Sequence, residues 1–223
     1  MIKRSISNPN MLKVIDVNSQ TAYYGCDQEW YATEWQRCAG CGPSVVSTML
    51  LYLDRVSSLS KYGVNTKADC LSLMEEVWQY VTPTDHGIPT TKLLYEDVLQ
   101  YGEAKALTIE YYVCDMPEEP SARPAFPELL RFIAGALHQD IPVAFLNLCN
   151  GDEQNLDCWH WVTIIGLEYD ESGASALVTI VDEGVLKKID LALWYKTTTQ
   201  GGGFLYFTAS SMVNSGVRQM QSV

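Results

Sequence analysis

Helical and strand-like patterns occupy different halves of this chain, and this segregation constrains its fold more than any other feature. Helical spacing of apolar residues dominates up to about residue 104, whereas alternating or short continuous apolar runs dominate after it. Repeated βαβ units would mix the two patterns along the whole chain. The sequence therefore predicts an α+β fold whose sheet is mostly antiparallel.

The first half predicts three helices, over 43–53, 68–81 and 91–101. Pro43 fits the first position of a helix, because its missing N–H would be unpaired there anyway. Gly102 is expected to stop the third helix. Residues 1–22 carry no strong pattern. The stretch 23–40 is rich in Trp, Tyr and Cys, lacks periodicity, and is interpreted as a loop.

The second half predicts strands over 107–113, 141–148, 159–169, 175–182 and 204–208, and a helix over 128–139. The proline-rich segment 116–127 is interpreted as an extended loop or a boundary between two lobes. A length of 223 residues fits one large domain. We therefore expect a single domain over 1–223, with a helical lobe at about 23–104 and a sheet lobe at about 105–210.

The sharpest local feature is the sequence QRCAGCGPSVVSTMLLYL, residues 36–53. Cys41 comes just before the first turn of the predicted helix, where unpaired N–H groups and the helix dipole favour an anion. A thiol there ionises more readily to the nucleophilic thiolate. Gln36 lies slightly upstream and could, with the Cys41 N–H, hold a developing oxyanion. The competing interpretation of Cys41 is a small buried apolar residue.

One of the three histidines, His160, opens a predicted strand and has aromatic neighbours. His86 lies in a polar loop, and His138 lies at a helix end, where a cation suits the dipole. A neutral imidazole can take the proton of a thiol and return it to a leaving group. His160 is therefore the candidate general base, with a structural histidine as the other interpretation.

Asp182 ends the strand that a short turn joins to the strand of His160. Residues at the ends of adjacent strands can meet side by side. Asp182 could then fix the tautomer and orientation of His160, which is the third role in a nucleophile–base–orienter triad. A polar strand terminator is the other interpretation of Asp182, and Asp170 and Glu183 are rival acceptors.

The order CGPSVVSTMLLYL, then HWVTIIGLEYDESG, then IVDEG resembles the C39-like cysteine peptidases of the papain-like superfamily. The similarity extends to GIPTTKLLYEDVLQYG and IPVAF and covers about residues 36–195. It implies a papain-like fold, with a central Cys-bearing helix packed on a C-terminal antiparallel sheet. It also implies thiol-dependent hydrolysis of a peptide or amide bond through an acyl-enzyme, without a cofactor. The implied roles are nucleophile for Cys41, base for His160, orienter for Asp182 and oxyanion donor for Gln36.

Two other classes of function compete with this interpretation. Cys38, Cys41, Cys158 and His160 offer a Cys₃His set for zinc, although that reading leaves Gln36 and Asp182 unexplained. A redox C-x-x-C motif would need a βαβ context, which the pattern lacks. A non-catalytic peptide-binding module of the same fold is the remaining alternative.

Composition excludes some partners. A net charge of −12 argues against nucleic acid and against anionic lipid surfaces. The apolar runs are too short for a membrane helix, and no signal-peptide core is visible near residue 1, so a cytoplasmic location is expected unless a signal was removed. The seven cysteines leave at least one unpaired, and Cys38 could pair with Cys26 or Cys158 in an oxidising compartment.

Residues next to the two motifs are candidates for binding a peptide or protein substrate. Trp35, Trp159 and Gly40 are the predicted contacts, whereas Trp161 suits the core equally well. Acidic residues in the neighbouring loops would favour a cationic or neutral substrate; they are Glu29, Glu34, Asp152, Glu153 and Asp157.

Overall fold

The structure is a computed structural model that describes residues 1–57, 66–170 and 173–211. It confirms the α+β fold with an antiparallel sheet. Seven strands form the main sheet in the order β4-β9-β5-β6-β7-β8, with β1 paired to β6 outside this path. The strands are β1 (Ile2–Ser5), β4 (Leu107–Met116), β5 (Val143–Asn147), β6 (His160–Tyr169), β7 (Ala176–Asp182), β8 (Val185–Asp190) and β9 (Gly202–Ser211).

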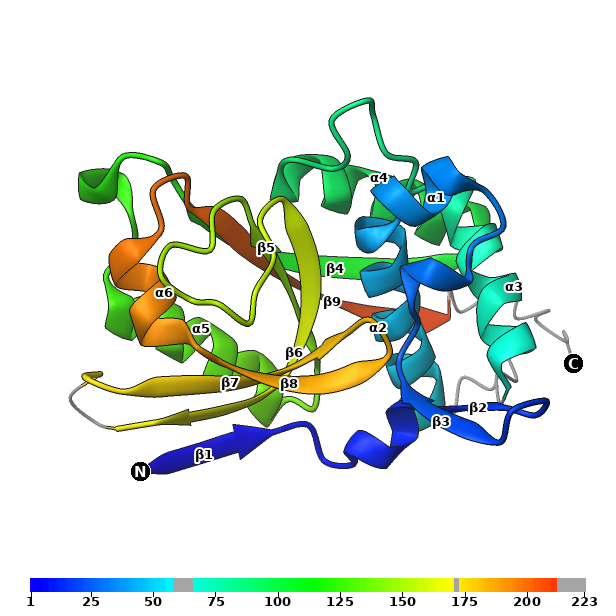
Figure 1. Cartoon of the computed structure of the whole chain (residues 1–223), viewed down its shortest axis with the longest axis horizontal. Coiled ribbons are helices and arrows are strands. Elements are labelled where there is room, and N and C mark those ends of the chain that lie inside the picture. The colour runs from blue at the N-terminus through cyan, green and yellow to red at the C-terminus, as the bar shows by residue number, and fades with distance from the viewer. Residues whose placement is uncertain (58–65, 171–172, 212–223) are drawn as a thin grey trace, which may run out of the picture.

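Helices cover the sheet and extend beyond it on one side (Figure 1). They are α1 (Glu34–Ala39), α2 (Cys41–Ser57), α3 (Lys67–Trp78), α4 (Thr91–Ala104), α5 (Phe126–His138) and α6 (Leu191–Thr197). A small hairpin of β2 (Lys13–Asp16) and β3 (Thr21–Tyr24) lies at the bottom of the α2 and α3 side in Figure 1. Short 3₁₀ turns are η1 (Pro9–Leu12), η2 (Gln28–Trp30) and η3 (Pro120–Ala122).

Helix α2 is the centre of the molecule. The sequence predicts one buried face, but almost every residue from Gly42 to Asp54 is buried. A helix that is apolar on all sides has to be enclosed by other elements. Helix α2 packs against β6 on one side and α3 on another, and Figure 1 shows it standing between the sheet and the α1–α3 side. Its first residue, Cys41, therefore has a rigid support.

Two predicted element boundaries are wrong for identifiable reasons. The stretch 23–40 is not a loop, because it holds the end of β3, η2 and α1. Helix α1 begins with a capping box in which Thr33 and Gln36 satisfy each other's backbone N–H groups. Gly102 lies inside α4 and does not end it; a Cβ there would lie 2.5 Å from Ile109, so the glycine permits close packing against β4.

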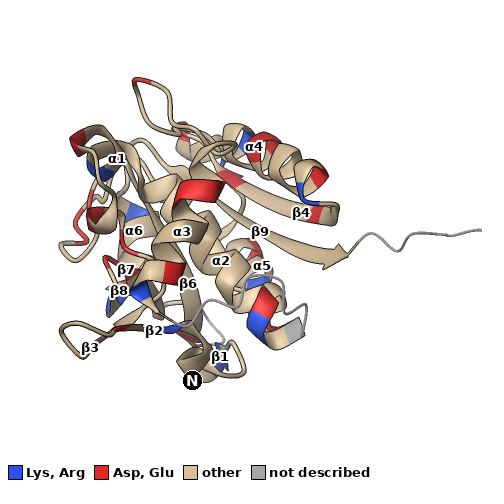
Figure 2. Cartoon of the chain, turned by 90° about the vertical axis from the view of Figure 1, so that its right-hand side faces the viewer, with Lys and Arg blue, Asp and Glu red and all other residues tan. Residues whose placement is uncertain are grey.

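Further elements were not predicted from the sequence: β1, β2, β8 and α6, together with the 3₁₀ turns. Within the described ranges, no helix is both long enough and apolar enough to cross a membrane. Ribbon segments coloured for Asp or Glu are visible on α1, α3 and α4 in Figure 2.

Candidate active site

Cys41 is the first residue of α2, two positions earlier in the helix than the sequence predicts from Pro43. Gly40 ends α1 and is buried where the two helices meet, with Tyr31 only 2.8 Å from where a Cβ would be. Gly40 therefore allows the two helices to join, and the structure does not bring it to the surface that a substrate would touch. The Cys41 thiol is partly exposed at the N-terminus of α2.

His160 and Asp182 lie side by side at one edge of β6 and β7. The two strands are antiparallel, and Ile164 stands opposite Ile180. Since side chains alternate along a strand, His160 and Asp182 fall on the same face of the sheet. His160 Nε2 and Asp182 Oδ1 are 2.7 Å apart, and both side chains are buried. This hydrogen bond leaves Nδ1 as the ring nitrogen available to Cys41.

The charges at this edge reinforce one another. Burial opposes the imidazolium, but hydrogen bonds with Asp182 and Cys41 raise the pKa of His160 to about 10. Burial also opposes the Asp182 carboxylate, yet the hydrogen bonds from His160 and Lys187 lower its pKa. A cationic imidazole stabilises a neighbouring anion, and the thiolate anion is the reactive form of cysteine. The arrangement suits nucleophilic attack by sulfur followed by proton donation from nitrogen.

The structure does not aim Gln36 at Cys41. Gln36 is a buried residue of α1, and its Nε2 donates to Glu75 Oε2 at 2.9 Å. Its Oε1 accepts from the Thr33 backbone N–H and hydroxyl, as the capping box requires. The sequence Thr-Glu-Trp-Gln carries the capping-box signature, so this role was visible in the sequence.

Gln28 is the amide that shares a cavity with the site. This small cavity of about 20 Å³ is lined by Gln28, Cys41, His160 and Asp182, among other residues. Gln28 Oε1 is buried and has no hydrogen-bond partner among the residues that the structure describes, which is unusual for a polar atom in a folded protein. Rotating the Gln28 carboxamide by a half turn would place its two N–H donors, in place of Oε1, at this position beside the cavity. No sequence pattern singled out Gln28, because it lies in the stretch interpreted as a loop.

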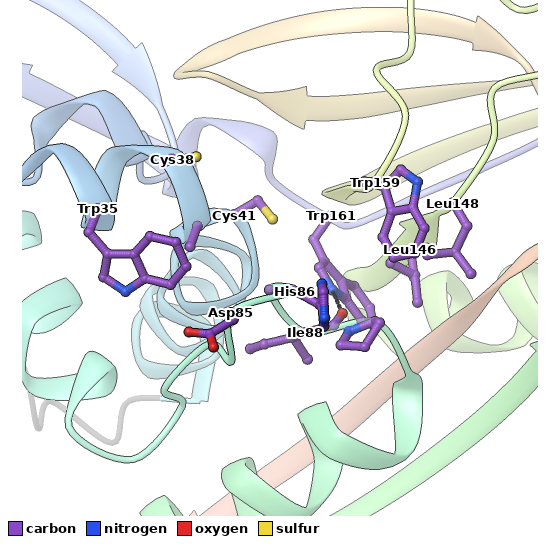
Figure 3. A pocket seen from close by; sticks show the side chains of 13 residues that line it. Trp35, Cys38, Cys41, Asp85, His86, Ile88, Leu146, Leu148, Trp159 and Trp161 are labelled. Carbon is purple, nitrogen blue, oxygen red and sulfur yellow. Dashed lines mark hydrogen bonds between the residues drawn. The ribbon is translucent and has the colours of Figure 1, made fainter.

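A larger cleft of about 390 Å³ opens on the other side of Cys41 (Figure 3). Trp35 from α1 and Trp159 before β6 lie on opposite sides of the Cys41 thiol. Both indoles are exposed, by 46% and 55%, whereas Trp161 is 2% exposed and donates from Nε1 to the Ile88 carbonyl. The remaining walls are mostly apolar and come from residues 85–89, Leu146 and Leu148.

Trp159 is held in an unusual backbone conformation. Its φ is +54°, a region that costs energy for residues with a Cβ. Trp159, which directly precedes His160, thus keeps its large apolar side chain in solvent at the cost of a strained backbone. Strained conformations of this kind cluster at functional sites. The observation points to a contact with a ligand.

The charged groups in the cleft differ from those predicted. Asp85 and His86 line it, although the sequence predicts only an ordinary polar loop around His86. None of the five acidic residues predicted near the motifs is among the described residues that line this cleft. Glu153, for example, is buried and accepts hydrogen bonds from the backbone N–H groups of Asn155 and Asp190.

The proposed zinc set does not assemble. Among the described residues, no group of three or more His, Cys, Asp or Glu side chains is placed to hold a metal ion. Cys158 donates to Asn150 Oδ1, whereas His160 is bonded to Asp182. All seven cysteines lie in the described ranges and are free thiols, so neither suggested partner of Cys38 is bonded to it.

Comparison with known proteins places the fold. The crystal structure of UfSP from C. elegans matches with a TM-score of 0.53 and 9% sequence identity, over 94% of this chain and 34% of that one. The chain has the papain-like cysteine protease fold. It spans about a third of the length of UfSP. No family model and no curated protein sequence matches the chain, and the likeness does not single out the C39-like group.

Proposed function

We propose that this chain is a C39-like cysteine peptidase or amidase that hydrolyses a peptide or amide bond with Cys41, His160 and Asp182. The observation that carries the proposal is the buried 2.7 Å contact of His160 with Asp182, with Cys41 within hydrogen-bond reach of the same imidazole. A nucleophile, a base and an orienting acceptor in this geometry are the parts that such chemistry needs. The papain-like fold gives independent support.

In the first half of the reaction, the Cys41 thiolate attacks the carbonyl carbon of the substrate. The negative charge that develops on the carbonyl oxygen is stabilised by the Cys41 backbone N–H and the Gln28 carboxamide. The carbon–nitrogen bond then breaks as the His160 imidazolium gives its proton to the leaving amine. The acyl group remains on Cys41 as a thioester.

In the second half, the now neutral His160 takes a proton from water, and the resulting hydroxide attacks the thioester carbonyl. Sulfur leaves as thiolate, which the imidazolium again stabilises. Asp182 keeps Nε2 of His160 engaged throughout, so Nδ1 faces the reacting atoms. Trp35 and Trp159 flank Cys41 and would hold apolar parts of a peptide or protein substrate.

The first test measures the reactivity of Cys41 without a substrate. We expect iodoacetamide at about pH 6.5 to modify Cys41 ~10-fold faster than Cys38, which is an exposed free thiol lining the same cleft. Peptide mapping by mass spectrometry resolves each site. Cys149 must be followed too, because hydrogen bonds from Thr199 lower its pKa to about 7. His160→Gln should slow the alkylation of Cys41 to the rate of Cys38 and leave the alkylation rate of Cys149 unchanged.

The second test asks for turnover. A peptide library incubated with the protein should yield cleaved products by mass spectrometry, and Cys41→Ala should yield none. Fast alkylation of Cys41 without cleavage of any peptide would contradict peptide hydrolysis. If Cys41 reacts no faster than Cys38 but peptides still bind the cleft, the chain is a binding module and the proposal is wrong.

A further inference from the structure

Lys187 makes a close contact with the site from outside the triad. Its Nζ lies 2.7 Å from Asp182 Oδ2 and 3.0 Å from Glu183 Oε2. The other carboxylate oxygen of Asp182, Oδ1, is the one bound to His160. The Asp182 carboxylate, which is 2% exposed, therefore contacts the Lys187 ammonium through one oxygen and the His160 imidazole through the other.

The β7–β8 hairpin fixes this contact. Asp182 stands opposite Val185 across a two-residue turn, and Ile180 stands opposite Lys187. Asp182 and Lys187 are thus diagonal neighbours on one face of the sheet, within reach of a long side chain. Both turn residues, Glu183 and Gly184, have positive φ, as the tightest hairpin turns require. The register of the β7–β8 hairpin therefore determines that Lys187 lies next to Asp182.

Sharing the carboxylate has an electrostatic consequence for His160. A buried carboxylate bound to imidazole alone would stabilise the imidazolium strongly. The ammonium of Lys187 offsets part of that negative charge and repels a proton on the ring. It also keeps Asp182 ionised despite burial, since the hydrogen bond from Lys187 lowers its pKa. Together, these two effects keep the Asp182 carboxylate in place as the hydrogen-bond acceptor and limit the proton affinity of His160.

Other titratable groups face the same region. Cys41 approaches His160 from α2, and Cys26 lines the small cavity beside it. Glu183 lies in the turn, and Asp27 lies against that turn at Gly184. These groups are acidic or are thiols, so among the described residues Lys187 is the cation, besides the His160 imidazolium, that is in direct contact with Asp182.

We propose that Lys187 is a positioning residue that tunes His160 by sharing the Asp182 carboxylate, which makes the imidazolium a better proton donor to the leaving amine. This inference rests on the proposed function, because it assigns Lys187 a role in the same reaction. Lys187 is not among the described residues that line the cleft beside Cys41, and its contact with the triad is with Asp182, so its effect passes through that carboxylate. Replacing it should therefore change the proton affinity of His160 and the rate of the chemical steps more than substrate binding.

The test is an NMR titration of the His160 ring in a Cys41→Ala background, which removes the Cys41 side chain that also raises the pKa of His160. Histidine signals are assigned with His160→Gln. Lys187→Met should raise the pKa of His160 by roughly half a pH unit to one pH unit, because a positive charge is lost close to the ring. Lys187→Arg should restore the original value. In the Cys41-containing protein, Lys187→Met should lower kcat several-fold and leave KM nearly unchanged.

Lys188→Met is the matched control. Lys188 is the next residue of β8 and pairs with Glu168 at 2.8 Å, away from the triad. It should alter neither the His160 titration nor kcat. If Lys187→Met fails to fold, Glu183→Gln decides, because freeing Lys187 from its second partner should lower the pKa of His160.

Two failures can be told apart. An unchanged or lowered pKa of His160 in Lys187→Met, or the same change in Lys188→Met, would overturn the role of Lys187 and leave the proposed function intact. Failure of Cys41 to outpace Cys38 in the alkylation experiment would overturn the proposed function itself, whatever the titration shows.

Discussion

The two sides of Cys41 are built on opposite principles. Towards the sheet lie polar groups in short contact with one another: His160 and Asp182 are buried, and the partly exposed Lys187 contacts Asp182. Towards the cleft lie exposed indoles, Trp35 and Trp159, whose rings have no ring contact in the described part of the chain. The sheet side is determined by strand register, whereas the cleft side is carried by α1 and by loops.

This difference has a physical reason. Buried charged groups are costly unless each has a partner, so they need a scaffold that fixes their geometry. Exposed apolar side chains cost little, gain from being covered by a ligand, and tolerate change. We therefore expect changes on the sheet side to alter chemical steps, and changes on the cleft side to alter the choice of substrate.

The largest effect should come from the amide that serves the oxyanion. Gln28→Ala should lower kcat about 10²–10³-fold on a peptide identified by the library screen, because one donor to the transition state is lost. Thiol alkylation should change much less, since no oxyanion forms there. Steady-state kinetics and alkylation on the same preparation measure both.

Gln36→Ala is the control for this comparison. It should leave kcat within a few-fold and instead lower the free energy of unfolding by about 1 kcal/mol, because the capping box of α1 is broken. If Gln36→Ala abolishes turnover while Gln28→Ala does not, the donor assigned from the shared cavity is wrong and Gln36 must turn towards Cys41 in the complex.

An intermediate effect is expected at the exposed indole. Trp159→Gly should lower kcat/KM about 10-fold for peptides with large apolar side chains, because a covering surface is lost. It should leave alkylation of Cys41 unchanged. It should also not lower the melting temperature, since glycine accepts the positive φ at this position. Kinetics, alkylation and thermal melting together distinguish a binding role from a structural one.

Trp161→Phe supplies the opposite case. Trp161 is buried, and its Nε1 satisfies the Ile88 carbonyl. Its replacement should cost about 1–3 kcal/mol of stability, because a buried acceptor is left unpaired. A stable Trp161→Phe variant together with an unstable Trp159→Gly variant would reverse the comparison drawn between the two indoles.

Much of this arrangement was predictable from the sequence. The α+β fold follows from the segregation of helical and strand patterns. The neighbourhood of Cys41, His160 and Asp182 follows from element boundaries: a Gly-Pro helix start, an apolar strand opened by histidine, and the end of the adjoining strand. Such boundaries are visible in a few neighbouring residues of the sequence. The short turn between the strands of His160 and Asp182 also limits the registers in which those strands can pair.

The remaining parts depend on contacts between side chains from distant segments. Gln28 lies in a stretch without periodicity, and its place beside Cys41 is decided by how η2 packs. Lys187 lies on β8, a largely exposed strand whose pattern predicts no element, and its partner is set by hairpin register. Nearness to Cys41 in the sequence and the resemblance to C39-like peptidases both predict Gln36 as the oxyanion donor, but its side chain forms the cap of α1 instead.

The smallest effect concerns stability and compares two buried carboxylates. Asp182 has two partners, and its pKa is lowered from 3.8. Asp97 on α4 has a buried Oδ2 that has no hydrogen-bond partner in the described part of the chain, and burial raises its pKa to about 6. Between pH 3.8 and about 6 the folded chain therefore binds a proton at Asp97 that the unfolded chain releases, so stability falls as the pH rises through this window. The stability that Asp182 contributes is present above pH 3.8 and is lost as the pH falls through its lowered pKa.

The two asparagine variants should consequently have effects of opposite sign. Asp97→Asn should raise the free energy of unfolding at pH 7 by about 1 kcal/mol, after allowance for solvent screening, and this gain should shrink below pH 6. Asp182→Asn should lower it by about 1–2 kcal/mol, and this loss should persist to about pH 4, because the buried carboxylate stays ionised and paired. Urea denaturation at about pH 4.5, 6 and 7.5 measures both. If both variants change the free energy of unfolding in the same direction at pH 7, charge pairing does not distinguish Asp182 from Asp97. The polar groups beside Cys41 would then be held in place by packing alone.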